Sequence, residues 1–65
     1  SRLLALTPAE IEVANLVRHG RTTKEIASFM NISSRTVDMH RLNIRKKLGL
    51  HRQGTNLRSY LLTNG

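Results

Sequence analysis

The chain has 65 residues and carries 11 Lys and Arg side chains against 4 Asp and Glu side chains, which gives a formal net charge of +7. This length allows one small domain, residues 1–65, and we expect no self-contained catalytic pocket and no enzyme, because folding buries only about 60% of the surface of so short a chain. The sequence has no Cys for a disulfide or a zinc site, no apolar run long enough to span a membrane and no signal peptide, so we expect a cytoplasmic protein without cofactor, metal site or membrane-spanning segment.

The first predicted helix spans residues 8–19. Thr7 and Glu10 stand at the spacing of a capping box, in which each side chain accepts a hydrogen bond from the backbone N–H of the other residue. Pro8 suits the first helical position because the N–H that it lacks would have no partner there. Gly20 follows the apolar stripe and ends the helix. We therefore interpret Glu10 as a capping residue and not as a catalytic acid.

The second predicted helix is short and leads into a tight turn. Thr22 and Glu25 repeat the capping box, and Asn31 tolerates the left-handed backbone conformation that ends a helix. Ser33 then caps a third helix after a turn of about three residues. Two helices joined by so short a turn must cross steeply, which is the geometry of a helix-turn-helix unit.

The third predicted helix spans residues 34–48 and ends before Gly49. Its inward stripe, at helical spacing, consists of Val37, His40, Ile44 and Leu48. Its opposite face mixes basic, acidic and apolar groups and consists of Arg35, Asp38, Met39, Leu42, Arg45 and Lys46. A protruding helix of this kind fits the width of the DNA major groove.

A fourth helix is predicted over residues 52–63, although Gly54 and Asn56 are poor residues for its first turn. We expect Leu57 and Leu61 to face the core. The side chains left as candidates for a surface that pairs two copies are Arg58, Tyr60 and Leu62. Since no stretch alternates apolar and polar residues like a strand, the predicted fold class is all-α, a four-helix helix-turn-helix domain.

The positive charge is concentrated in the second half of the chain. Residues 1–38 hold five basic and all four acidic side chains, whereas residues 39–65 hold six basic and no acidic ones. This asymmetry favours a polyanionic partner, which leaves duplex DNA, RNA or an anionic lipid surface as candidates. RNA is less favoured, because single-strand recognition uses aromatic stacking and the chain offers only Phe29 and Tyr60.

Several motifs stand in fixed register over residues 6–50. They are Leu6-Thr7-x-x-Glu10-x-x-Val13, Gly20, Lys24-x-Ile26-Ala27, Ile32-Ser33, Thr36-Val37-x-x-His40, Asn43-Ile44 and Lys47-Leu48-Gly49. In these motifs the chain resembles the LuxR, FixJ and GerE family of bacterial transcription-factor domains. The resemblance implies sequence-specific binding to double-stranded DNA, with the third helix in the major groove and with a homodimer, paired through the fourth helix, on two half-sites.

The resemblance also implies the C-terminal effector domain of a longer regulator, such as a response regulator, whose sensory part precedes it. The start at Ser1, without an initiator Met, fits such an excised domain. RNA polymerase is a further candidate partner. A bacterial regulator of this kind would be associated with the nucleoid when bound.

Base contacts are implied for the outward residues of the third helix, where this sequence departs from the family. Many relatives carry a basic residue at the positions of Asp38 and Leu42. The carboxylate of Asp38 can accept a hydrogen bond from a cytosine amino group, and Met39 and Leu42 can lie against thymine methyl groups. Arg35, near the helix start, suits guanine or phosphate. The predicted base-contacting residues are therefore Arg35, Asp38, Met39 and Leu42.

Phosphate contacts are implied for Lys24, for Thr36 and for Lys47 or its neighbours, and we expect them to give affinity with little sequence preference. The full predicted set is Thr23, Lys24, Ser34, Thr36, Arg41, Arg45, Lys46 and Lys47. For the basic cluster at 45–47 the alternative is a solvated face that complements the negative end of the helix dipole.

Two other functions remain open. The acidic and apolar face at Asp38, Met39 and Leu42 also suits a protein-interaction module on a degenerate helix-turn-helix scaffold, which predicts weak and non-selective DNA binding. The promoter-reading region of a sigma-like factor shares the capped first helix and the recognition helix, although the family motifs from Asn43 to Gly49 fit it less well.

Overall fold

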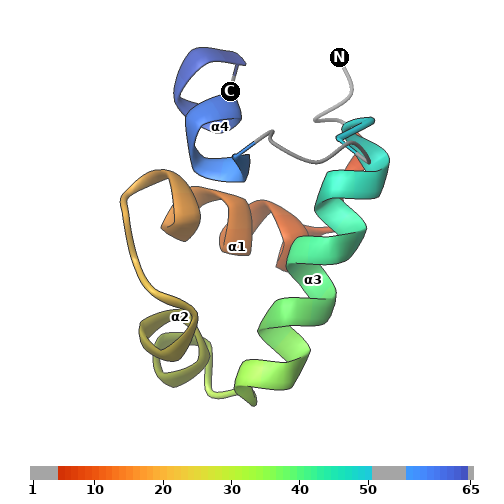
Figure 1. Cartoon of the computed structure of the whole chain (residues 1–65). Coiled ribbons are helices and arrows are strands. Elements are labelled where there is room, and N and C mark those ends of the chain that lie inside the picture. The colour runs from red at the N-terminus through yellow and green to blue at the C-terminus, as the bar shows by residue number, and fades with distance from the viewer. Residues whose placement is uncertain (1–4, 51–55, 65) are drawn as a thin grey trace.

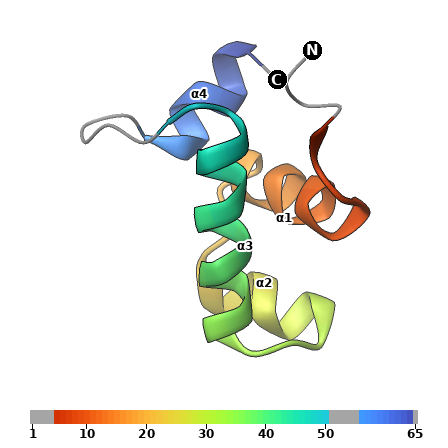
Figure 2. The same cartoon turned by 90° about the vertical axis from the view of Figure 1, so that its right-hand side faces the viewer.

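The computed structural model describes residues 5–50 and 56–64, which form four helices and no strand (Figure 1). The helices are α1 (Pro8–Arg18), α2 (Thr23–Met30), α3 (Ser34–Lys47) and α4 (Leu57–Asn64). Helix α1 lies at the centre and packs against the other three, with α2 and α4 on opposite sides of it (Figures 1 and 2). The predicted all-α class is confirmed. None of the four helices has the length and apolar character needed to cross a bilayer.

Both predicted capping boxes are present. The Thr7 hydroxyl oxygen accepts from the Glu10 backbone N–H at 3.2 Å, and Glu10 Oε1 accepts from the Thr7 backbone N–H at 2.9 Å. The same reciprocal bonds join Thr22 and Glu25, at 3.1 and 2.9 Å. Each box satisfies backbone donors that a helix start leaves without partners, which fixes where α1 and α2 begin. Helix α1 ends at Arg18, one residue earlier than predicted.

The turn between α2 and α3 has the three residues expected of it. Asn31 adopts φ 58° and ψ 46°, which is the left-handed conformation that asparagine tolerates. Ile32 N donates to Ala27 O at 3.0 Å, and the Ser33 hydroxyl accepts from Thr36 N at 3.1 Å to cap α3. The turn makes the two helices cross steeply, so that Figure 1 shows α2 nearly end-on and α3 along its length.

The fourth helix begins later than predicted. Asn56 lies outside α4, and its Oδ1 accepts from Ser59 N at 3.0 Å. Asn56 is therefore the residue that caps the helix, as its side chain favours, and not a weak position within it. Residues 52–55 of the predicted span lie outside the described residues. Helix α3 ends at Lys47, with Leu48 as its cap and Gly49 next at φ 76°.

The core collects one stripe from each helix. Its buried members are Leu6, Val13, Ala14, Val17, Ile26, Ala27, Val37, Ile44, Leu48, Leu50, Leu57 and Leu61. The predicted inward residues of α3 and α4 are among them, except that His40 is only half-buried. Because Val37 and Ile44 are fully buried, α3 is held firmly along one side, and its other side is left for contacts outside the fold.

Candidate nucleic-acid interface

The four predicted base-contacting side chains are exposed on one face of α3. Asp38 and Met39 lie three and four residues after Arg35, and Leu42 lies four and three residues after them, which places all four on the same side of a helix. Met39 is 58% and Leu42 is 52% exposed. Figure 2 shows α3 in front of the other helices. This face of α3 is therefore accessible to a DNA groove.

The first turns of α2 and α3 contribute polar groups. Lys24 and Ser34 are exposed, and Thr23 and Thr36 are half-buried. The Thr36 hydroxyl lies 2.9 Å from the Ser33 hydroxyl, so the two form a hydrogen bond at the start of α3. Helix N-termini carry partial positive charge, which makes these turns suitable for phosphate.

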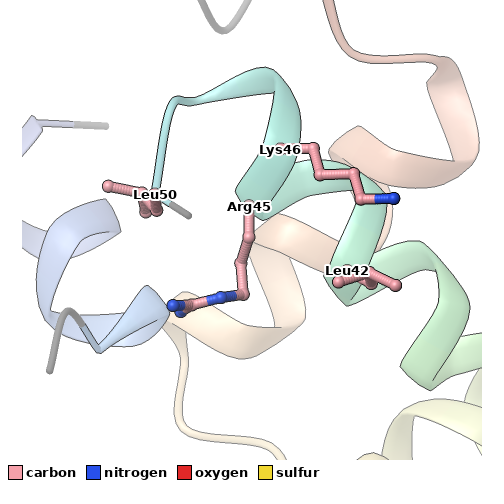
Figure 3. A pocket seen from close by; sticks show the side chains of 4 residues that line it. All are labelled: Leu42, Arg45, Lys46 and Leu50. Atoms are coloured by element: carbon pink, nitrogen blue, oxygen red, sulfur yellow. The ribbon is translucent and has the colours of Figure 1, made fainter. Parts of the chain in front are cut away.

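The second half of α3 is basic. Arg41 and Arg45 are half-buried and Lys46 is exposed. Arg45 and Lys46, together with Leu42 and Leu50, line a shallow hollow of about 210 Å³ (Figure 3). In this view Lys46 and Leu42 point to one side of α3, whereas Arg45 points toward the side of α4. Of these groups, Lys46 extends the exposed face beyond Leu42.

Lys47, the last residue of α3, is paired within the molecule. Its Nζ donates to Glu10 Oε1 at 2.7 Å, and the Glu10 side chain is 5% exposed while that of Lys47 is 34% exposed. Burial raises the pKa of Glu10, but the hydrogen bonds from Lys47 and Thr7 and the Lys47 charge outweigh it, so this pKa lies below its ordinary value. A residue predicted to contact phosphate therefore already has a carboxylate partner.

This ion pair was not among the predictions, although part of its signal is in the sequence. Glu10 shares its helical stripe with Val13, Ala14 and Val17, at spacings of three, four and seven residues. A carboxylate on such a stripe is buried and needs a cation. Which cation it finds depends on how α1 packs against α3, because Lys47 lies 37 residues further along the chain.

The predicted pairing residues of α4 differ in their surroundings. Leu62 is 58% exposed, and Arg58 is exposed as well. The Arg58 guanidinium lies beside Gly20, where an added Cβ would be 3.3 Å from Nη2. Tyr60 is half-buried and packs against the core. Leu62 is thus the apolar side chain of α4 that a second copy can cover.

The chain matches the family model described as bacterial regulatory proteins, luxR family, over residues 4–55. It belongs to this family. Among its relatives, it is 52% identical over 46 residues to the uncharacterized response regulatory protein YgeK of Escherichia coli strain K12, a match that covers 71% of the chain and 31% of YgeK. It is 47% identical over 45 residues to the transcriptional regulatory protein MctR of Rhizobium johnstonii, which covers 69% of the chain and 21% of MctR.

The chain is also 49% identical over 43 residues to the tetrathionate response regulatory protein TtrR of Salmonella typhimurium, covering 66% of the chain and 21% of TtrR. It thus spans between 21% and 31% of the length of these relatives. No solved structure matches the chain.

Membership of the luxR family favours DNA binding among the functions that the sequence left open. The chain is a luxR-family DNA-binding domain and not an enzyme. The family match extends across α1, α2 and α3, so the exposed face of α3 belongs to a luxR-type fold.

Proposed function

We propose that the protein binds operator DNA as a homodimer on two half-sites, with α3 of each copy in the major groove. The observation that carries this proposal is the division of α3 into two sides. Val37 and Ile44 are fully buried on one side, and Met39 and Leu42 are more than half exposed on the other. A helix anchored in this way can enter a groove about 12 Å wide without losing its core contacts.

The exposed face of α3 supplies base contacts of three kinds. Asp38, an acidic group on a basic domain, is repelled by phosphate and instead accepts from the amino group of cytosine. Met39 and Leu42 pack against thymine methyl groups, and Arg35 donates to guanine. We therefore propose a half-site with cytosine and thymine next to each other. This half-site differs from one read by a helix with basic residues at the positions of Asp38 and Leu42.

Phosphate contacts hold the domain in register on the duplex. The residues that we propose for this role are Thr23, Lys24, Ser34, Thr36, Arg41, Arg45 and Lys46. On α4, Leu62 and Arg58 pair two copies, with Tyr60 supporting them from the core side. We further propose that the domain acts in the cytoplasm, at the nucleoid, as the C-terminal effector part of a longer regulator that acts on RNA polymerase.

The test is selection of preferred sequences from a random duplex library by the wild-type protein and by two variants, Asp38→Asn and Leu42→Ala. We expect each variant to change the preference at one position of the half-site and to lose about 1 to 3 kcal/mol of discrimination there. If the wild-type protein bound all duplexes weakly and equally, the proposal would fail, and the exposed Met39 and Leu42 would favour a protein-interaction module.

A further inference from the structure

The Lys47–Glu10 pair connects the end of the recognition helix to the start of the central helix. Glu10 lies in the first turn of α1, and Lys47 is the last residue of α3. Glu10 Oε1 accepts from Lys47 Nζ at 2.7 Å and from the Thr7 backbone N–H at 2.9 Å. A single oxygen therefore closes the capping box of α1 and fixes the last turn of α3.

The burial of the two partners shows which of them depends on the other. The Glu10 side chain is 5% exposed, so its charge is stabilised by the protein and not by water. If Lys47 turned outward to a phosphate, it would leave a buried carboxylate with backbone partners alone, which is costly. The positive charge of Lys47 is thus already used inside the fold.

We infer that Lys47 is a positioning residue for DNA binding and not a phosphate contact. Helix α3 is continuous over Ser34–Lys47, with α2 packed against its beginning and α1 beside its later turns (Figure 1). The ion pair holds the far end of this rod on α1 and so sets the direction in which Arg35, Asp38 and Met39 project. This role rests on the proposed placement of α3 in the major groove.

Lys46 provides a matched control for Lys47. The two residues are adjacent, carry the same charge and lie in the same last turn, but Lys46 lines the hollow beside Leu42, whereas Lys47 is paired with Glu10. The experiment compares Lys46→Met with Lys47→Met in the salt dependence of binding to a duplex of random sequence. A lost phosphate contact lowers the slope of log K against log salt by about 0.9. We expect this decrease for Lys46→Met and an unchanged slope for Lys47→Met.

A second readout separates positioning from a purely structural role. It is the ratio of the affinities for the best duplex selected by the wild-type protein and for the random duplex, measured at a temperature at which circular dichroism shows each variant folded. Lys47→Met should lower this ratio about fivefold, which is the effect of one weakened base contact. Lys46→Met should leave the ratio unchanged, and Lys47→Arg, which keeps the ion pair, should restore it.

If Lys47→Met does not fold, the double variant Glu10→Gln/Lys47→Met replaces it, because it removes the unpaired carboxylate together with its partner. The double variant should also keep the salt slope of the wild-type protein, and its affinity ratio should be lowered as in Lys47→Met. A slope lowered by about 0.9 in Lys47→Met or in the double variant would overturn the inference, as would an unchanged affinity ratio in a folded variant. Failure of the wild-type protein to select any sequence would overturn the proposed function instead, and the slopes on random duplex would still decide the role of Lys47.

Discussion

At the scale of single residues, Glu10 combines a local and a long-range role. It closes the capping box with Thr7, three residues before it, and it pairs with Lys47, 37 residues after it. The first role follows from the Thr-x-x-Glu sequence pattern of a capping box. The second depends on the packing of two helices. A substitution at Glu10 therefore affects both the start of α1 and the end of α3.

The pH dependence of stability follows from the lowered pKa of Glu10. The folded state binds the proton of Glu10 less tightly than the unfolded state does. The ionised carboxylate therefore stabilises the fold fully above its ordinary pKa of 4.5. This stabilisation is lost as the pH falls through the lower pKa of the folded state. We expect Glu10→Gln to destabilise the protein by about 1 to 3 kcal/mol at pH 7, less than loss of a fully buried pair, since Lys47 is 34% exposed.

Urea unfolding at pH 7 and at pH 3 measures this effect. The difference between wild type and Glu10→Gln should shrink at the lower pH, where the wild-type carboxylate takes up its proton. Glu12→Gln, at an exposed position on the same helix, is the control and should change stability by less than about 0.5 kcal/mol. A difference between wild type and Glu10→Gln that is the same at both pH values would contradict the assignment.

At the scale of helices, the starts of α1, α2 and α3 were predictable because each is fixed by a side chain within three residues of the amide that it caps. Asn31 and Gly49 marked the ends of α2 and α3 for an equally local reason, since few other residues adopt positive φ. The start of α4 was predicted wrongly because Asn56 was judged by helix propensity and not as a cap. The exposed face of α3 followed from periodicity, but the partner of Lys47 could not.

The cap of α3 gives a prediction for this element. Ser33→Ala removes the acceptor for Thr36 N and the partner of the Thr36 hydroxyl, so it should destabilise the protein by about 1 kcal/mol. Ser34→Ala, at the exposed first position of the helix, is the matched control and should have little effect. Thermal or urea unfolding of the two variants tests the cap, and equal stability of both would show that Ser33 does not hold the helix start.

At the scale of the whole molecule, the charged face of α3 and the exposed Leu62 of α4 lie in different places. The basic half of α3 extends the face that carries Asp38 and Met39, whereas Leu62 is exposed on α4, on the far side of α1 from α2 (Figure 1). In the proposed dimer, each copy contacts DNA through α3 and its partner copy through α4. This separation is what binding to two half-sites requires.

The dimer prediction is tested by Leu62→Glu, which places a charge where a second copy would cover an apolar side chain. We expect the wild-type protein to bind a duplex with two half-sites cooperatively and the variant to bind the same half-sites independently, as measured by titration of the two-site and one-site duplexes. Ile11→Glu, a similar change at a 49% exposed position on α1, should keep the cooperativity. Cooperative binding by Leu62→Glu would exclude the proposed surface on α4.

The measurement that tests the central claim most directly is an NMR titration of the protein with duplex DNA, in which every backbone amide reports its own change in chemical shift. If α3 lies in the major groove, the changes will concentrate at the first turn of α2 and at residues 33–46, and they will persist at physiological salt for a selected duplex. Changes confined to α1 or α4, or diffuse changes that vanish on addition of salt, would contradict the account.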